Sequence, residues 1–176
     1  GNASTAGSGS FTLDTVAPTV STVAITSATG IQNSTLNAGD VVSVTVTMSE
    51  AVNVTGTPQL TINVGGTNKT ANYSSGSGTA SLVFTYTIAS GDTDANGISI
   101  AANSLALNSG TIADLAGNAA TITHSAVADN ASYLVDTTAP ATPTVTLGTG
   151  VSDGATSTEA TQAGGVVTVK IGRAHV

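Results

Sequence analysis

Apolar and polar residues alternate with a period of two along several stretches of the chain. In 41-VVSVTVTMS-49 the even positions hold Val, Val, Val and Met, while Ser and Thr occupy positions 43, 45 and 47. In 81-SLVFTYTIA-89 the even positions hold Leu, Phe, Tyr and Ile. Shorter alternating stretches occur at 19–26, 60–64, 70–74, 98–100, 120–123 and 132–136. This period predicts β-strands that each carry one apolar face.

Clusters of Gly, Asn, Asp and Ser separate these stretches and predict turns. They lie at 37–40, 65–66, 75–78 and 108–110. About seven short strands with one apolar face need a second sheet to cover that face. We therefore expect an all-β fold, an immunoglobulin-like β-sandwich.

A sequence repeat indicates how the chain is organised. The segment 13-LDTVAPTV-20 returns as 135-VDTTAPAT-142, and 136 − 14 = 122 residues separate the two aspartates. We predict a tandem array in which residues 1–14 end one module, 15–136 form a complete module, and 137–170 begin a third, divergent module. Pro18 and Pro140 make the joints short and semi-rigid. Residues 171–176 match the in-frame translation of a common sequencing adapter, so we expect them to be an artefact.

Composition narrows the functions that this chain can perform. Charged residues make up 7% of the chain, and the formal net charge is −7. This balance excludes a basic groove for nucleic acid. The absence of cysteine excludes disulfides and thiolate metal sites. No apolar run approaches membrane-spanning length, so we expect no membrane insertion.

We also expect no enzymatic activity. His124 is the only histidine before the suspect tail, and it lies beside the alternating stretch 120–123, so we interpret it as structural. The chain has three Tyr, two Phe and no Trp, too few to line a cleft for glycoside hydrolysis.

The stretch 91-GDTDANGISI-100 carries a candidate calcium loop. Asp92, Asp94 and Asn96 alternate and Gly97 follows, which matches the first half of a calcium-binding loop. Position twelve of that motif is Asn103 instead of Glu, and no helix pattern flanks it, so this is not an EF-hand. The alternative is a solvated turn, because Asp, Asn and Gly favour turns unaided.

A second candidate calcium site follows from the expected topology. In an immunoglobulin-like sandwich the end of the strand at 41–49, the loop at 112–120 and the N-terminal joint meet at one end of the module. This places the side chains of four residues together at the boundary with the preceding module: Asp14, Glu50, Asp114 and Asn118. The loop at 91–97 is expected at the opposite end, near Asp136, which is a further candidate calcium ligand.

Four stretches of this chain resemble a known family. They are 43-SVTVTMSEAVNVTGTPQLTINVGG-66, 86-YTIASGDTDANGISIAANSLAL-107, 114-DLAGNAA-120 and 135-VDTTAP-140. Together they resemble the immunoglobulin-like repeats of large bacterial surface adhesins of the RTX type, which type I secretion exports. The resemblance covers about residues 11–150.

The resemblance implies an extracellular, cell-surface location and a role in cell adhesion and biofilm formation. It implies that Ca²⁺ bound within or between neighbouring modules stiffens the chain, while other domains bind the host or surface ligand. Two other functions stay open: a module that itself binds a ligand or glycan, and an accessory domain of a secreted hydrolase. An exposed aromatic cluster around Tyr73 or Tyr86 would favour the first of these.

Overall fold

The computed structural model describes residues 13–147 and 167–170, with side chains described for residues 13–143. The segments 1–12 and 171–176, and most of the predicted third module, therefore lie outside the described residues. The chain separates into two compact units, Gly1–Thr137 and Thr138–Val176. The described residues contain strands and no helix, which confirms the all-β prediction, and none of their elements is a long apolar helix that could cross a membrane.

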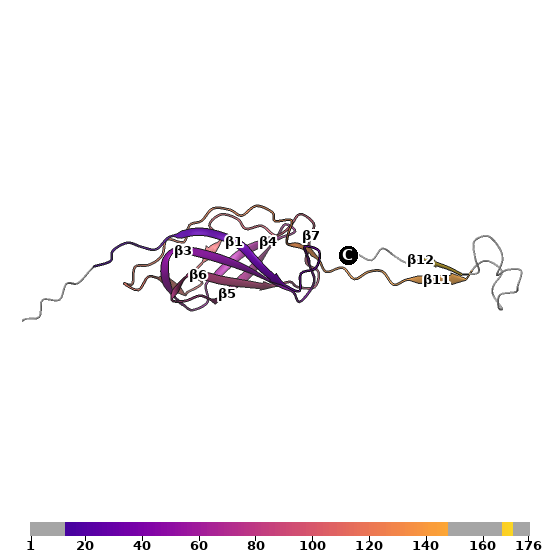
Figure 1. Cartoon of the computed structure of the whole chain (residues 1–176), viewed down its shortest axis with the longest axis horizontal. Helices are drawn as coiled ribbons and strands as arrows, with labels where there is room; N and C mark the ends of the chain where they lie inside the picture. Colours follow the sequence, from indigo (N-terminus) through magenta and orange to yellow (C-terminus); the bar gives the residue numbers. More distant parts are fainter. Residues whose placement is uncertain (1–12, 148–166, 171–176) are drawn as a thin grey trace, which may run out of the picture. The chain divides into compact units, whose positions relative to one another are not determined.

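Seven strands of the first unit form the main sheet, and all of its strand pairs are antiparallel. In spatial order these are β1 (Val20–Thr29), β3 (Val41–Thr55), β6 (Thr79–Thr87), β5 (Thr67–Ser75), β4 (Gln59–Val64) and β8 (Leu105–Ala106), and β9 (Thr111–Ala113) pairs with the last residues of β3 (Figure 1). β1 is an edge strand, and its pairing with β3 is interrupted by register shifts at Val20/Thr22 and at Ile25/Ser27.

A second sheet of the same unit has three short strands, in the order β2 (Thr35–Leu36), β10 (Leu134–Asp136) and β7 (Thr93–Asp94). β10 pairs with β2 in parallel and with β7 in antiparallel orientation. The predicted strands at 98–100 and 120–123 form only isolated bridges, among them Ile100 with Val127 and Thr19 with Thr121. In the second unit, β11 (Thr144–Leu147) pairs with β12 (Val167–Lys170).

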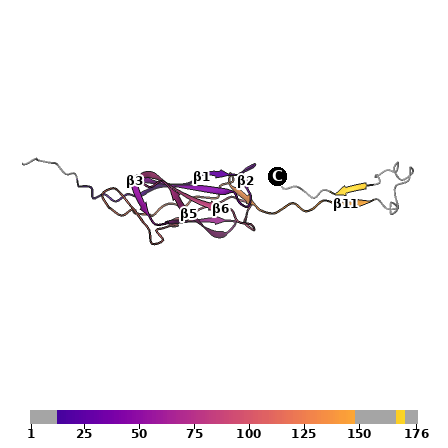
Figure 2. The ribbon, with the colours of Figure 1, turned by 90° about the horizontal axis from the view of Figure 1, so that it is seen from below.

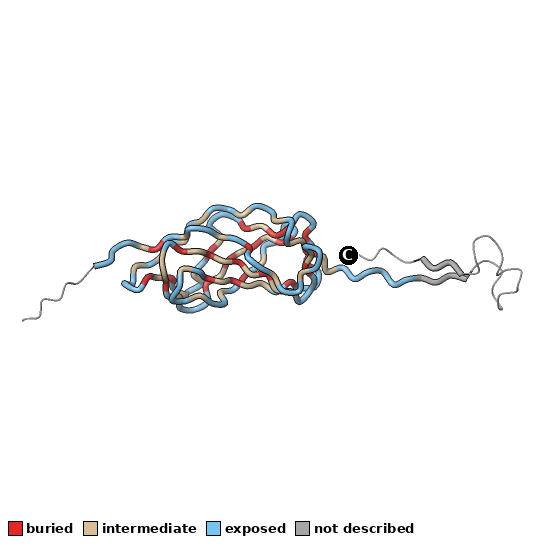
Figure 3. The backbone as a smooth tube through the Cα atoms, in the orientation of Figure 1, coloured by how far each residue is buried: buried red, intermediate tan, exposed pale blue. Residues whose placement is uncertain are grey.

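The core of the first unit lies inside the curl of the main sheet. Figure 2 shows β1 and β5, both strands of that sheet, on opposite sides of the unit. Leu36 of β2 and Val135 of β10 join the same hydrophobic cluster as the main-sheet side chains. Along β3 and β6 buried residues alternate with more accessible ones, as the period of two predicts (Figure 3). A curled antiparallel sheet and a small mixed sheet around one core are consistent with a β-sandwich.

The two ends of the first unit are built from different elements. Figure 1 shows the N-terminal segment reaching the unit at the end where β3 bends, while β7 lies at the opposite end, where the chain leaves. The predicted boundary site and the predicted 91–97 loop lie at these two ends.

Candidate metal centre

Three carboxylates meet at the N-terminal end of the unit. One oxygen each from Asp14, Glu50 and Asp114 lie within 4.8 Å of one another. Glu50 lies in β3, where pairing with β6 is interrupted between Thr47 and Val52, and Asp114 directly follows β9. The structure thus brings together the three acidic residues that sequence reasoning placed at this end.

Backbone hydrogen bonds fix the segment that carries Asp14 next to the strand that carries Glu50. The Ser49 N–H donates to the Thr19 carbonyl at 2.8 Å, and the Thr19 N–H donates to Ser49 Oγ at 3.0 Å. On the other side, the Thr121 N–H donates to the Pro18 carbonyl at 2.8 Å. The segment at 14–19 is therefore held between β3 and the chain at 121, and Asp14 is positioned accordingly.

Asp114 is the buried member of the group, with 4% of its surface exposed. Its carboxylate accepts hydrogen bonds from the Asn118 N–H at 2.8 Å and from Asn118 Nδ2 at 2.7 Å. Burial raises the pKa of Asp114, but these bonds and those from the N–H groups of Ala116 and Gly117 outweigh it, so its pKa lies below 3.8. The side chain is therefore a carboxylate at neutral pH.

The tight turn at 114–118 depends on Gly117, which has a φ of 94°. This left-handed conformation is open to glycine and strained for most other residues. The turn directs the Asn118 amide back onto Asp114.

Asn118 also bridges the turn to the N-terminal segment. Its Nδ2 group donates to the Asp14 carbonyl at 3.1 Å and lies 3.5 Å from the Val16 carbonyl. The donor end of the amide thus faces the acidic group, and Asn118 positions Asp14 and Asp114. That Asn118 is itself a metal ligand stays a prediction.

No cationic side chain of this unit neutralises the three carboxylates. Lys69 is the only Lys or Arg in residues 1–137, and its Nζ bonds Asp92 at 2.6 Å. Carboxylate and carbonyl oxygens are the ligands that Ca²⁺ and Mg²⁺ prefer. The three carboxylates therefore fit a hard divalent cation.

The loop at 91–97 uses its first acidic residue in a different way. Asp92 is buried, and its two oxygens accept bonds from Lys69 Nζ at 2.6 Å, Tyr86 Oη at 2.6 Å and the Ala89 N–H at 3.0 Å. Burial raises the pKa of Asp92, but the bonds from Lys69, Tyr86 and Ala89 and the Lys69 charge bring it below 3.8. Burial and the Asp92 carboxylate together raise the pKa of Tyr86 to about 12.

Asp94 caps two turns of the backbone. One oxygen accepts the N–H groups of Asn96 at 3.2 Å and Gly97 at 2.8 Å, and the other accepts the Gly65 N–H at 2.8 Å. Gly97 has a φ of 99°, and a Cβ there would lie 2.1 Å from the Asn130 carbonyl oxygen.

Asn96 Nδ2 donates to the Asp129 carboxylate, and Asp136 pairs with Thr93 in the second sheet. The structure thus gives Asp92, Asp94 and Asn96 hydrogen bonds within the protein. Among the described residues it brings together no group of three acidic or histidine side chains at this end to match that at Asp14. That these residues and Asp136 bind Ca²⁺ stays a prediction.

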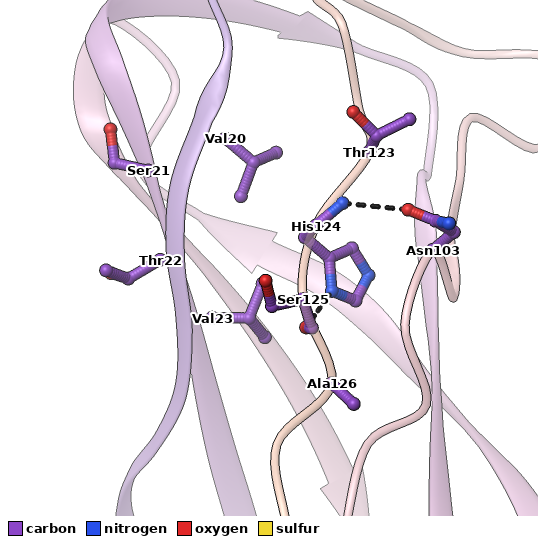
Figure 4. A pocket seen from close by; sticks show the side chains of 9 residues that line it. All are labelled: Val20, Ser21, Thr22, Val23, Asn103, Thr123, His124, Ser125 and Ala126. Carbon is purple, nitrogen blue, oxygen red and sulfur yellow. Dashed lines mark hydrogen bonds between the residues drawn. The ribbon is translucent and has the colours of Figure 1, made fainter.

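His124 lies in a groove of about 440 Å³ between β1 and the segment 123–126 (Figure 4). Its Nε2 accepts the Ser104 N–H at 2.9 Å, and its Nδ1 lies 2.8 Å from the Ser125 carbonyl. Ser104 Oγ is 3.4 Å from Nε2, but Nδ1 faces a carbonyl instead of the carboxylate that orients the histidine of a catalytic triad. These bonds hold the turn at 103–104 against the segment at 124.

Sequence reasoning missed Lys69 and Tyr86 as the partners of Asp92. One signal was available: a single basic residue in a strongly acidic unit, on an alternating strand, is expected to pair with a buried acid.

The fold and the site define an all-β module with an acidic group suited to a divalent cation at its N-terminal end. Comparison with known protein families, curated protein sequences and solved structures finds no match for this chain.

Proposed function

We propose that residues 15–136 are an immunoglobulin-like extender module of a bacterial cell-surface adhesin, stiffened by Ca²⁺ at its N-terminal boundary. Its role is structural and non-enzymatic: it holds a distal binding domain away from the cell and supports adhesion and biofilm formation. The resemblance of residues 11–150 to adhesin repeats and the two β-sheets around one core support this proposal.

One observation carries the calcium part of the proposal. Asp14 belongs to the segment that precedes the sandwich, whereas Glu50 and Asp114 belong to the sandwich itself, and their oxygens lie within 4.8 Å of one another. A cation bound by all three would tie the incoming segment to the body of the module. Without a cation the three carboxylates repel one another, and the segment is less firmly held.

The expected contribution of one ion is modest. For a Kd of ~0.1 mM, typical of extracellular calcium modules, ~1 mM Ca²⁺ adds about 1.4 kcal/mol to the free energy of unfolding. Repeated at each boundary of an array, this binding converts a chain of modules into a stiffer rod.

The test is calcium titration of the full chain by isothermal calorimetry, with thermal melting in Ca²⁺ and in EDTA. We expect Ca²⁺ to bind and to raise the melting temperature, and Glu50→Gln to weaken binding by more than tenfold. Asp40→Asn removes one negative charge from a turn that belongs to neither candidate site, and it should leave binding unchanged. Equal melting of the wild-type chain in Ca²⁺ and EDTA would contradict the proposal, and stronger binding of Mg²⁺ would change the ion assigned.

Tyr73 and Tyr86, which could have supported glycan binding if exposed, make contacts within the first unit instead. Tyr73 packs edge-to-face on Phe84, with ring centroids 5.8 Å apart, and its hydroxyl accepts the Ser77 N–H at 2.7 Å. The Tyr86 hydroxyl donates to Asp92. Both rings are half-buried, so they do not form an exposed platform for a sugar, and the extender role remains our proposal.

A further inference from the structure

The chain leaves the first unit through a short segment, residues 133–137, that we call the exit strap. Val135 is 3% exposed and pairs with Leu36 on one side and Asp94 on the other, so its side chain is part of the core. Two residues later, Thr137 Oγ1 accepts the Gly91 N–H at 3.0 Å and donates to the Asp92 carbonyl at 2.9 Å. Asp136 therefore lies between two anchored residues.

The loop beneath the strap is itself held rigidly. The Asp92 side chain is fixed by Lys69 at 2.6 Å and by Tyr86 at 2.6 Å, and this fixes the backbone that Thr137 contacts. The only basic residue of this unit thus acts at the point where the chain exits.

The sequence repeat gives the N-terminal strap, residues 11–15, the same pattern. Phe11, Leu13, Asp14 and Thr15 align with Tyr133, Val135, Asp136 and Thr137. Leu13, however, is 84% exposed here, where its counterpart Val135 is buried. Leu13 is one of three exposed large hydrophobic residues in the described part of the chain, and the other two, Val16 and Leu115, adjoin the same acidic group. Apolar side chains gathered at one end of a unit indicate a surface that another body covers.

The other side of the N-terminal strap belongs to this unit. The Asp14 carboxylate accepts the Val16 N–H at 3.0 Å and lies in the acidic group, and its carbonyl accepts Asn118 Nδ2. Leu13 and Thr15, on either side of Asp14, are both exposed in this unit.

We propose that the strap is shared between successive modules. Leu13 and Thr15 anchor in the core and exit loop of the preceding module, as Val135 and Thr137 anchor in this one, and Asp14 between them is thereby presented to the cation site of this module. The partner for this end of the unit is thus a second module of the same fold. The identity of the ion in this inference rests on the proposed function. The anchoring of the strap in the preceding module does not.

The test uses a longer protein in which residues 1–137 are followed directly by residues 16–176, so that two copies of the module are joined where the sequence repeats align. In this protein Asp136 of the first copy takes the place of Asp14 for the second copy, whose Glu50 and Asp114 complete the internal site. Calcium titration of this protein should show an internal site that binds about tenfold or more tightly than the site of the single chain, because the strap is ordered before the ion binds.

Three variants in the first copy identify the cause. Asp136→Asn should abolish the tight site. Thr137→Val removes both hydrogen bonds of the strap hydroxyl and should weaken the internal site about fivefold. Thr22→Val is the matched control, because Thr22 is exposed and its hydroxyl makes no hydrogen bond, and it should leave binding unchanged.

A second readout needs no ion. In the calcium-free proteins, the NMR order parameter at Val135 of the junction should be near 0.85, against a value below about 0.6 at its counterpart Leu13 of the single chain. Equal affinity of the two sites, with no effect of Thr137→Val, would overturn the shared strap and leave the proposed function intact. If neither protein binds calcium, the proposed function is overturned. The order parameters then test the shared strap independently, and low values at the junction would refute it.

Discussion

Replacing Asp92 with Asn separates two roles for the loop at 91–97. The wild-type carboxylate accepts three hydrogen bonds, from Lys69 Nζ at 2.6 Å, Tyr86 Oη at 2.6 Å and the Ala89 N–H at 3.0 Å. Asn keeps one acceptor oxygen and turns an NH₂ group toward a donor. The variant therefore loses at least one of these bonds and the negative charge that strengthens the others.

The magnitude follows from the burial and the charge of this group. A hydrogen bond to a charged group contributes about 1.5–3 kcal/mol to stability, against about 0.5–1.5 kcal/mol for a neutral one. The Lys69 side chain is 25% exposed, so water screens part of its attraction to Asp92. We expect Asp92→Asn to lower the free energy of unfolding by about 3 kcal/mol.

Urea unfolding at pH 7, followed by tyrosine fluorescence, measures this loss. All three tyrosines lie in residues 1–137, so the signal reports the first unit alone. For an m-value of about 2 kcal/mol per M, the midpoint should fall by about 1.5 M, equally in Ca²⁺ and in EDTA. Asp40→Asn is the control, because that carboxylate accepts the Asn37 N–H at 2.7 Å and an amide oxygen can replace it.

The calcium dependence decides the outcome. A loss that appears only in Ca²⁺ would make Asp92 an ion ligand and refute the structural role derived from its hydrogen bonds. If the free energy of unfolding falls by less than 1 kcal/mol both in Ca²⁺ and in EDTA, these bonds are far weaker than hydrogen bonds to a charged group normally are.

Two further predictions concern the core and the response to acid. Phe84 is fully buried and packs on Tyr73, so Phe84→Ala should destabilise the first unit by about 3–5 kcal/mol in the same urea assay, and a loss below 1 kcal/mol would contradict its place in the core. Asp92 and Asp114 have folded pKa values below 3.8, so their contribution is present above that pH and is lost as the pH falls through the folded pKa values. Melting temperatures from pH 5 to pH 2 should therefore decrease, with a shallower decrease in Asp92→Asn; an unchanged slope in that variant would refute the assignment.

The long strands could be predicted from the sequence because their side chains obey a strict period of two. The stretch 41–49 forms the first part of β3 and the stretch 81–89 covers most of β6, and their even-numbered apolar residues supply much of the core. The stretches 98–100 and 120–123 have the same pattern but form single bridges, since a short alternating stretch does not determine how many partners it bonds.

The grouping of Asp14, Glu50 and Asp114 could be predicted from where strand ends meet in a sandwich. The roles of Asp92 and Asp94 could not be predicted from the sequence, because a calcium loop and a hydrogen-bonded turn use the same residue types at the same spacing. What distinguishes them here is the position of Lys69, Tyr86 and the Gly65 N–H, which come from other strands.

The two register shifts in β1 affect how readily this edge strand can pair with another chain. An open sheet edge invites another edge to pair with it, and proteins usually prevent this with charged side chains. β1 carries none, because its sequence is VSTVAITSAT. Its bulges instead break the regular ladder of donors and acceptors, which disfavours pairing of this edge with the same edge of a second copy.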